Sequence, residues 1–213
     1  LCIPAAFVDS ALNQLDKKSL DGKILCSAVK GVIPETNTIV ADYLEQRFQF
    51  NPDNVVIVTG PSHAEEVAQE KLTYLTVASR LESNASLIAG IFNCRFIKTS
   101  LSSDIYGTEY APVLKNIMAL ASGICFGLGY GDNFQAVLIS NAIKEMERFL
   151  LAVHLVPREI TSSVYLGDLL VTAYSQFSRN RLFGNMIGKG YSVKSAQVEM
   201  KMIHPQIESR VQA

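Results

Sequence analysis

The pattern of apolar residues changes abruptly at about residue 106, and this change constrains the fold more than any other feature of the sequence. Before it, short apolar runs typical of buried strands alternate with segments of helical periodicity. After it, long helical patterns follow one another without a strand signal. Alternating strands and helices indicate a mostly parallel sheet. We therefore expect an α/β domain over residues 1–106 and an all-helical domain over residues 107–213.

The apolar periodicity also predicts individual elements. In the first domain we expect strands at residues 1–4, 23–29, 55–59, 72–78 and 95–99. Helices are expected there at residues 5–15, 34–48 and 83–92, with another beginning near His63. Pro34 suits the first turn of its helix. In the second domain we expect helices at residues 111–125, 133–153, 158–174, 179–188 and 192–202.

Composition excludes several classes of function. The net charge of −1 argues against a nucleic acid or an anionic membrane as a partner held by bulk electrostatics, so an anionic ligand needs a local cluster of donors. No apolar run is long and pure enough to span a bilayer, and no secretory leader is recognisable. The 4 cysteines are scattered, three of them in apolar surroundings, which suits reduced core thiols of a cytoplasmic protein. The 3 histidines are scattered too, and we expect no metal.

One lysine, Lys115, lies near the start of an apolar helical run that ends in the glycine-dense turn GLGYG. A buried lysine is costly unless it has a partner, and burial lowers the pKa of its amine towards neutrality, where it can transfer protons. Alternatively, the side chain extends along the helix into water, which the spacing alone favours. The GLGYG turn does not follow a strand, so we interpret it as an inter-helix turn with Asp132 as the N-cap of the next helix.

Two predicted strands end in residues suited to ligands, because open α/β sheets bind ligands at the carboxyl ends of their strands. Lys30 and Gly31 follow one of these strands, and a lysine there can meet a phosphate. Gly60, Pro61 and Ser62 follow the next one; Gly60 allows close approach to a ligand, and Ser62 can cap the following helix. An ordinary loop lysine and a capped turn without a ligand are the alternatives.

A polar cluster in the helical half carries a third candidate site. Arg179 offers a planar fork for phosphate oxygens, and Ser178 and Asn180 add donors at a predicted helix start. Asp168 carries the charge needed to orient Lys115, or to hold its proton by a charge pair, if the fold brings the two together. A capped amphipathic helix with surface arginines fits the same residues equally well.

These stretches resemble, in order, the motifs of NAD(P)-dependent glycerol-3-phosphate dehydrogenases. The pattern E-x-x-x-A-L-K-N is matched by Glu109, Leu114, Lys115 and Asn116, with Val113 in place of alanine. The pattern G-P-[ST]-x-A-x-E is matched by Gly60, Pro61, Ser62, Ala64 and Glu66, with His63 in place of the common phenylalanine. Later motifs are matched by Gly123, Ile124, Gly129, Gly131, Asp132, Asn133, Gly167, Asp168, Leu169, Thr172, Ser175, Ser178, Arg179, Asn180, Phe183 and Gly184, with Ala173 in place of cysteine.

The resemblance implies the C-terminal part of a Rossmann-type dinucleotide-binding domain followed by an all-helical domain similar to that of 6-phosphogluconate dehydrogenase. It implies an oxidoreductase that interconverts sn-glycerol 3-phosphate and dihydroxyacetone phosphate with NAD or NADP and feeds glycerophospholipid synthesis. A cytoplasmic homodimer that binds a small phosphorylated substrate is expected, without nucleic acid or an integral membrane segment. The residues present do not distinguish NAD from NADP.

The resemblance also implies roles for single residues. Lys115 is the expected general acid and base. Substrate binding is expected from Lys30, Gly60, Ser62, Asn116, Asp168, Thr172, Ser178, Arg179 and Asn180, and cofactor binding from Lys30, Ala64 and Arg179.

The resemblance covers residues 1 to about 202, and the chain departs from the family pattern in two places. It begins at Leu1 without the family's G-x-G-x-x-[GA] loop, and its last residues leave the family pattern at Pro205. We therefore expect a fragment that is truncated at its C-terminus and lacks most of the cofactor grip. A related two-domain dehydrogenase for another 2-hydroxy or 2-keto substrate, or an inactive remnant that only binds or associates, are the alternatives.

Overall fold

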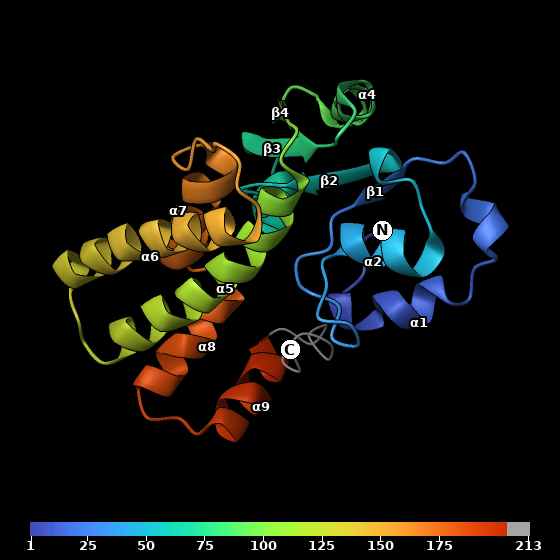
Figure 1. Ribbon diagram of the computed structural model, residues 1–213. Helices are drawn as coiled ribbons and strands as arrows, with labels where there is room; N and C mark the ends of the chain where they lie inside the picture. The colour runs from blue at the N-terminus through green and yellow to red at the C-terminus, as the bar shows by residue number, and fades with distance from the viewer. Residues whose placement is uncertain (204–213) are drawn as a thin grey trace. The chain divides into compact units, whose positions relative to one another are not determined.

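A computed structural model describes residues 1–203 (Figure 1). The chain forms two compact units, Leu1–Val113 and the residues from Leu114 onward. The division falls inside helix α5 (Ile105–Gly127), which continues through Pro112. We call these parts the first and the second unit and describe each by itself.

The first unit contains a sheet with the strand order β1-β2-β3-β4. Its strands are β1 (Leu25–Ser27), β2 (Val55–Thr59), β3 (Thr73–Ala78) and β4 (Ile97–Ser102). β1 pairs parallel with β2, and β3 pairs parallel with β4, but β2 and β3 are antiparallel. The carboxyl ends of β1 and β2 therefore lie at one edge of the sheet, and those of β3 and β4 lie at the opposite edge.

Helices cover both faces of this sheet, and β2 is therefore buried along its whole length. Side chains alternate between the two faces of a strand. Val56 and Val58 accordingly pack with α4 (Glu82–Phe92) through Ala85 and Ala89. Val55 and Ile57 belong to the larger core, which includes residues of α1 (Val8–Leu12), α2 (Val40–Phe48) and the start of α5. The strand predicted at residues 55–59 is confirmed.

Several predicted boundaries in the first unit are wrong. Residues 1–4 form no strand, although the Leu1 carbonyl accepts a hydrogen bond from the Ala28 amide at 2.9 Å. The segment predicted as a helix at residues 5–15 is a 3-10 turn, η1 (Ala5–Phe7), followed by the short α1. The remaining short elements are η2 (Lys17–Leu20), η3 (Pro52–Asn54) and α3 (Ala64–Ala68).

Helix α2 starts later than Pro34 suggested because the chain first closes a turn, in which the Ile33 amide donates to the Thr38 carbonyl at 2.8 Å. The N-cap residue Ile39 offers no side-chain acceptor. The buried carboxyl group of Glu109, on α5, replaces it: its two oxygens accept from the amides of Val40 and Ala41 at 3.0 and 3.1 Å. The start of α2 is thus completed by a residue far along the chain.

The second unit is helical, as predicted. After the end of α5 it contains α6 (Asp132–Val153), the π-helix η4 (Ser163–Gly167), α7 (Asp168–Tyr174), α8 (Arg179–Gly188) and α9 (Val193–Ile203). The GLGYG segment is the expected inter-helix turn. The N-cap of α6 is Gly131, however, and Asp132 is the first helical residue, so the prediction of Asp132 as the cap is wrong. The predicted helix at residues 158–174 begins only at Ser163, with a π-turn.

Helices α5 and α8 touch through their backbones. A Cβ atom on Gly123 would lie 2.1 Å from the Arg181 carbonyl oxygen, and one on Gly184 would lie 2.2 Å from that of Leu120. One turn further on, Gly127 and Gly188 are equally close to the facing backbone, at 2.4 and 2.3 Å. Only glycine fits this crossing, which we call the glycine seam.

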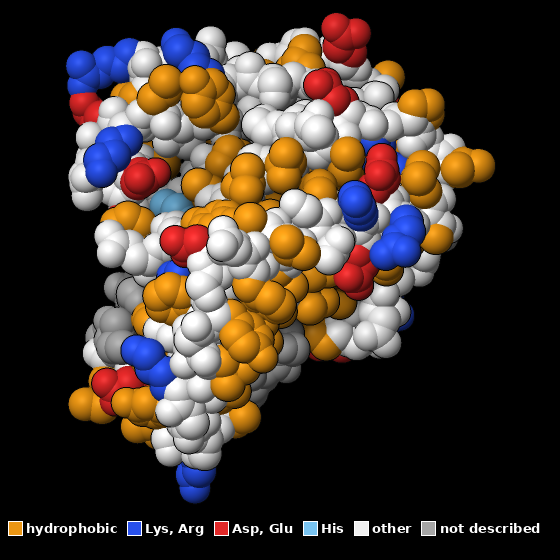
Figure 2. All heavy atoms as spheres, turned by 90° about the vertical axis from the view of Figure 1, so that its left-hand side faces the viewer, with side chains coloured by type: hydrophobic (Ala, Val, Ile, Leu, Met, Phe, Trp, Pro, Cys, Tyr) orange, Lys and Arg blue, Asp and Glu red, His pale blue; other side chains and the backbone are white. Residues whose placement is uncertain are grey.

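The surface of the second unit carries many apolar side chains. Over the turn between α5 and α6, the exposed ones are Phe126, Leu128, Tyr130, Phe134 and Val137. Figure 2 turns this end of the unit towards the viewer and shows a broad hydrophobic area with few charged groups. Among residues 1–203, no helix is both long and apolar enough to cross a membrane.

The 4 cysteines are free, but they are not the core thiols that the sequence predicted. Cys2 and Cys94 are exposed, while Cys26 and Cys125 are half-buried. Within the described part of the chain, no group of three or more histidine, cysteine or acidic side chains is arranged to hold a metal ion.

Candidate functional site

The centre of the candidate site is an ion pair in the second unit. Lys115 of α5 places its Nζ atom 2.5 Å from Oδ2 of Asp168, the first residue of α7. The two side chains are only 7% and 2% exposed. Two charges can be buried together in this way because each compensates the other. The alternative in which Lys115 extends into water is therefore wrong.

Thr172 lies one helical turn after Asp168 and is also buried. Its hydroxyl donates to the Asp168 carbonyl at 2.7 Å, within α7 itself. The Thr172 oxygen can still accept a hydrogen bond, because a hydroxyl has two lone pairs. Asn116 follows Lys115 on α5 and is half-buried. The structure thus brings Lys115, Asp168 and Thr172 together and places Asn116 next to them in the chain.

The start of α8 forms the second part of the site. Ser178 is the N-cap, is buried, and accepts a hydrogen bond from the Arg181 amide at 3.3 Å. Arg179 and Asn180 occupy the first turn of this helix and are half-buried. The first amides of a helix and its positive dipole end favour an anion, and the arginine adds a charged fork. This turn is therefore suited to bind phosphate oxygens.

In the first unit, two predicted site loops lie side by side. Lys30 and Gly60 each follow, by three residues, the aligned pair formed by Ser27 of β1 and Ile57 of β2. Because these strands are parallel, both loops leave the same edge of the sheet. This is the carboxyl edge, where open α/β sheets bind ligands.

In the structure, glycine is required at position 60 by backbone geometry and by a close contact, and not by the approach of a ligand that the sequence suggested. Its φ angle is +136°, and a Cβ atom there would lie 2.6 Å from the Tyr74 carbonyl oxygen on β3. Glycine is therefore required by the neighbouring strand, whether or not a ligand approaches. The cap of α3 is His63 rather than Ser62, with no side-chain capping bond, and Ala64 is its exposed first residue.

Thr59, the last residue of β2, is a candidate that the sequence reasoning missed. Its side chain is 3% exposed, and its hydroxyl has no hydrogen-bond partner among the described residues. A buried hydroxyl without a partner is costly, and it lies at the edge that carries Lys30 and Gly60. The hydroxyl group is therefore available to a polar ligand at this edge. The only local signal is a polar residue at the end of the apolar run VVIVT.

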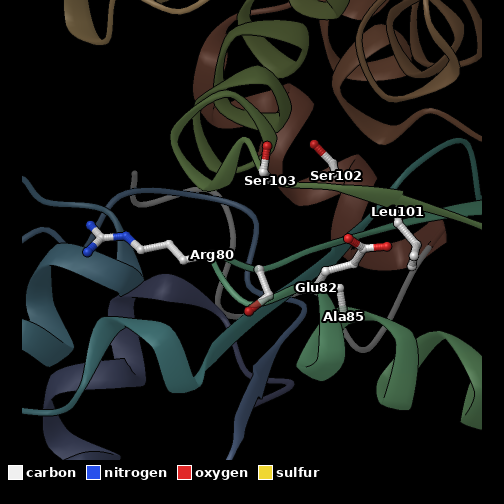
Figure 3. Close-up of a pocket in the computed structure, with 7 residues that line it drawn as sticks. Arg80, Glu82, Ala85, Leu101, Ser102 and Ser103 are labelled. Atoms are coloured by element: carbon white, nitrogen blue, oxygen red, sulfur yellow. The ribbon is translucent and has the colours of Figure 1, made fainter.

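A hollow in the first unit lies elsewhere, at the carboxyl ends of β3 and β4. It is lined by Ser79, Arg80, Glu82, Ala85, Leu101, Ser102 and Ser103 (Figure 3). Because β3 is antiparallel to β2, this hollow is at the opposite edge of the sheet from Lys30 and Gly60. Figure 3 shows the Arg80 side chain extending away from the other lining groups, so the hollow lacks the cationic cluster that a phosphate requires.

Two models of one protein family match the chain. A model of the NAD-dependent glycerol-3-phosphate dehydrogenase N-terminus matches residues 1–85. The model of the C-terminus of the same dehydrogenase matches residues 104–210, which include Lys115, Asp168 and Arg179. The chain belongs to this family. The expected resemblance and fold class, a Rossmann-like sheet followed by a helical domain, are confirmed.

Individual glycerol-3-phosphate dehydrogenases are similar over almost the whole chain. The enzyme named glycerol-3-phosphate dehydrogenase [NAD(P)+] 2 from Lactobacillus delbrueckii subsp. bulgaricus is 36% identical over 205 residues, covering 94% of this chain and 61% of the relative. The one from Clostridium botulinum is 36% identical over 203 residues, covering 95% and 61%. The chain thus spans about 61% of the length of these relatives.

Solved structures show the same relationship. Glycerol-3-phosphate dehydrogenase from Coxiella burnetii superposes with a TM-score of 0.85 at 28% identity, covering 93% of this chain and 60% of that one. The glycerol-3-phosphate dehydrogenase family therefore supplies both the sequence relatives and the closely matching fold.

Proposed function

We propose that the gene product carrying this chain interconverts sn-glycerol 3-phosphate and dihydroxyacetone phosphate, with NAD or NADP as the redox partner. The single observation that supports this most is the buried Lys115–Asp168 pair, which sits in the second unit of a chain from the glycerol-3-phosphate dehydrogenase family. The chain spans about 61% of its relatives, so the activity is proposed for the whole gene product.

The nicotinamide cofactor would supply the hydride when bound. Lys30, Ala64 and Arg179 would hold it. The free hydroxyl of Thr59, at the same edge of the sheet as Lys30, supports a polar ligand at the carboxyl ends of β1 and β2.

Lys115 would move the proton. In reduction its ammonium donates a proton from Nζ to the ketone oxygen, which becomes the hydroxyl of the product; in oxidation the neutral amine takes that proton back. Asp168 favours the ammonium form through its charge and fixes the direction of the side chain. Asn116 and Thr172 would orient the substrate next to Nζ. One hydride added to the carbonyl carbon and one proton added to its oxygen together convert the ketone into the hydroxyl group.

The start of α8 would hold the substrate phosphate. Arg179 offers a bidentate fork, and Ser178 and Asn180 flank it at a helix N-terminus. Lys30, Gly60 and Ser62 would also contribute to substrate binding. Binding energy from the phosphate, which does not react, would position the ketone for the proton and hydride transfers.

The proposal is tested by measuring dihydroxyacetone-phosphate-dependent oxidation of NADH and of NADPH with the full gene product. Turnover is expected in the wild type, and loss of about 100- to 10,000-fold in kcat is expected in Lys115→Ala. Lys144→Ala, which removes an exposed lysine of α6, is the matched control and should keep wild-type kcat. A folded, cofactor-binding protein without turnover would refute the proposal, and a parallel series of 2-keto acids would then reveal a different dehydrogenase.

We further infer a cytoplasmic homodimer. The exposed apolar side chains at the α5–α6 turn support association, because such patches are rarely left uncovered on a monomer. The exposed thiols of Cys2 and Cys94 suit a reducing compartment. Light scattering should give twice the protomer mass, and a value of one protomer at micromolar concentration would refute the dimer.

A further inference from the structure

Two polar contacts join helix α7 to α5, and one of them is the Lys115–Asp168 ion pair. We propose that Gln135 of α6, acting through Ser122 of α5, is a positioning residue that holds α7 where Asp168 meets the Lys115 ammonium. This inference rests on the proposed role of Lys115 in proton transfer. Neither Ser122 nor Gln135 belongs to the motifs that pointed to the family.

The other contact is a buried hydrogen-bond network, in which the single proton of the Ser122 hydroxyl is shared between two acceptors. The Ser122 hydroxyl lies 2.7 Å from Oε1 of Gln135 and 3.1 Å from the carbonyl oxygen of Ala173 on α7. The Gln135 amide donates to the Ser122 carbonyl at 3.1 Å. All three residues are buried, with Ser122 1% and Gln135 3% exposed. The network therefore joins α5, α6 and α7 by direct hydrogen bonds.

The contacts determine the orientation of the Gln135 side chain. Reversing its amide would place Oε1 against the Ser122 carbonyl, with two acceptors facing each other. The Ser122 hydroxyl has a single proton, and both of its neighbours are acceptors. Gln135 thus holds the hydroxyl from one side while Ala173 meets it from the other, which ties the position of α7 to that of α6.

A polar network of this kind is an unusual choice for packing alone. Burying an amide and a hydroxyl is costly unless every group finds a partner, and apolar side chains of similar volume fill such a space without that requirement. A satisfied buried network instead specifies one arrangement, because its hydrogen bonds are directional. We therefore infer that the network serves to position α7 rather than to stabilise the fold.

The spacing along the helices explains why this geometry affects the ion pair. Ser122 lies seven residues beyond Lys115, about 10 Å along α5, and Ala173 lies five residues beyond Asp168, about 7.5 Å along α7. One contact would let α7 pivot about it, whereas two separated contacts fix both its position and its tilt. Helix α7 has only 7 residues and also packs through Leu169 and Ala173 on the apolar side chains of Ile139 and Ala142, so directional hydrogen bonds fix a position that apolar packing alone leaves less defined.

The test compares Gln135→Leu, Ser122→Ala and the double variant in the full gene product, with Ser140→Ala on the exposed face of α6 as the matched control. A displacement of about 1 Å can lower a rate roughly 100-fold, so kcat is expected to fall by about 10-fold or more in Gln135→Leu, while KM for the phosphorylated substrate stays within about 2-fold. The double variant removes both side-chain partners but leaves the Ala173 carbonyl without its hydrogen bond, so it should recover part of the stability lost in the single variants, but not kcat. Recovery of kcat together with stability would overturn the proposal, because it would show a purely structural role.

A second readout does not depend on turnover. The rate at which an amine-reactive acylating reagent modifies Lys115, measured by mass spectrometry relative to the exposed Lys144, should rise several-fold in Gln135→Leu and stay unchanged in Ser140→Ala. An unchanged rate at Lys115 would overturn the positioning role. If the wild type did not turn over dihydroxyacetone phosphate, the proposed function would fail, but the labelling rates would still decide whether Gln135 positions the pair.

Discussion

The Nζ atom of Lys115 lies 2.5 Å from Oδ2 of Asp168, and less than a tenth of either side chain is exposed. Removing one partner leaves the other as a buried charge without compensation. We expect Lys115→Met and Asp168→Asn each to lower the free energy of unfolding by about 3–5 kcal/mol. The double variant should be more stable than either single variant, as urea denaturation will show. Single variants within about 1 kcal/mol of the wild type would mean that the pair is screened by water.

Arg179 tests the phosphate-binding turn separately from proton transfer. Arg179→Ala should raise KM for the phosphorylated substrate roughly 10- to 100-fold, because hydrogen bonds to charged groups contribute about 1.5–3 kcal/mol. The value of kcat should change little. Arg179→Lys keeps the charge but loses the fork, so it should recover only part of the affinity. Arg148→Ala, an exposed arginine on α6, is the control in steady-state kinetics. A fall in kcat at unchanged KM would contradict this role.

Replacing glycine by alanine should have opposite effects on stability in the glycine seam and at Gly90 on α4. Gly123→Ala and Gly184→Ala should destabilise the protein strongly, because the new Cβ atom would lie 2.1 or 2.2 Å from a backbone oxygen. Gly90→Ala, on the exposed side of α4 with no atom within 4 Å of the new Cβ, should raise stability by about 0.5–1 kcal/mol. Thermal unfolding followed by circular dichroism separates the two groups. A Gly123→Ala variant as stable as the wild type would exclude the close crossing.

Glu109 predicts how stability depends on pH. Burial raises the pKa of Glu109 from the ordinary 4.5 to about 8, although its hydrogen bonds from the Ala41 and Val40 amides act in the opposite direction. The folded protein therefore keeps a proton that the unfolded chain releases above pH 4.5. The contribution of Glu109 is fully present below pH 4.5 and is lost as the pH rises to about 8.

The variant Glu109→Gln cannot ionise and isolates this effect. The stability of the wild type relative to Glu109→Gln should fall steadily as the pH is raised from 5 to about 8, and then level off. Urea midpoints of both proteins measured side by side across this range give the difference, in which the other titrating groups cancel. A difference that stays constant with pH would show that Glu109 is ionised in the folded protein throughout the range.

Local patterns predicted those parts of the fold that depend on local interactions. The run Val55–Thr59 is apolar throughout and bounded by turns, and it is β2 as expected. The helix start expected at Pro34 failed because the deciding interactions are the turn from Ile33 to Thr38 and the carboxylate of Glu109, which no local pattern reveals. The direction of β3 could not be predicted either, because strand periodicity is the same in both directions.

The candidate site likewise combines residues that sequence motifs predict with contacts that only the packed structure reveals. Family motifs marked Lys115 and Asp168, and the structure brings these two side chains into contact. Burial of Lys115 could not be predicted, because the helical spacing alone favours a solvated lysine. Ser122 and Gln135 lie on different helices in no shared motif, and their hydrogen bonds appear only when α5, α6 and α7 are packed together.

The cap that Glu109 provides for α2 has a consequence for the synthesis of the protein. The carboxylate follows Val40 by 69 residues, so α2 leaves the ribosome long before its cap is made. At about 5–20 residues per second, the interval is on the order of 3–14 s. During this time the first amides of α2 must be hydrated, and the helix can be completed only when the beginning of α5 has been translated and has docked.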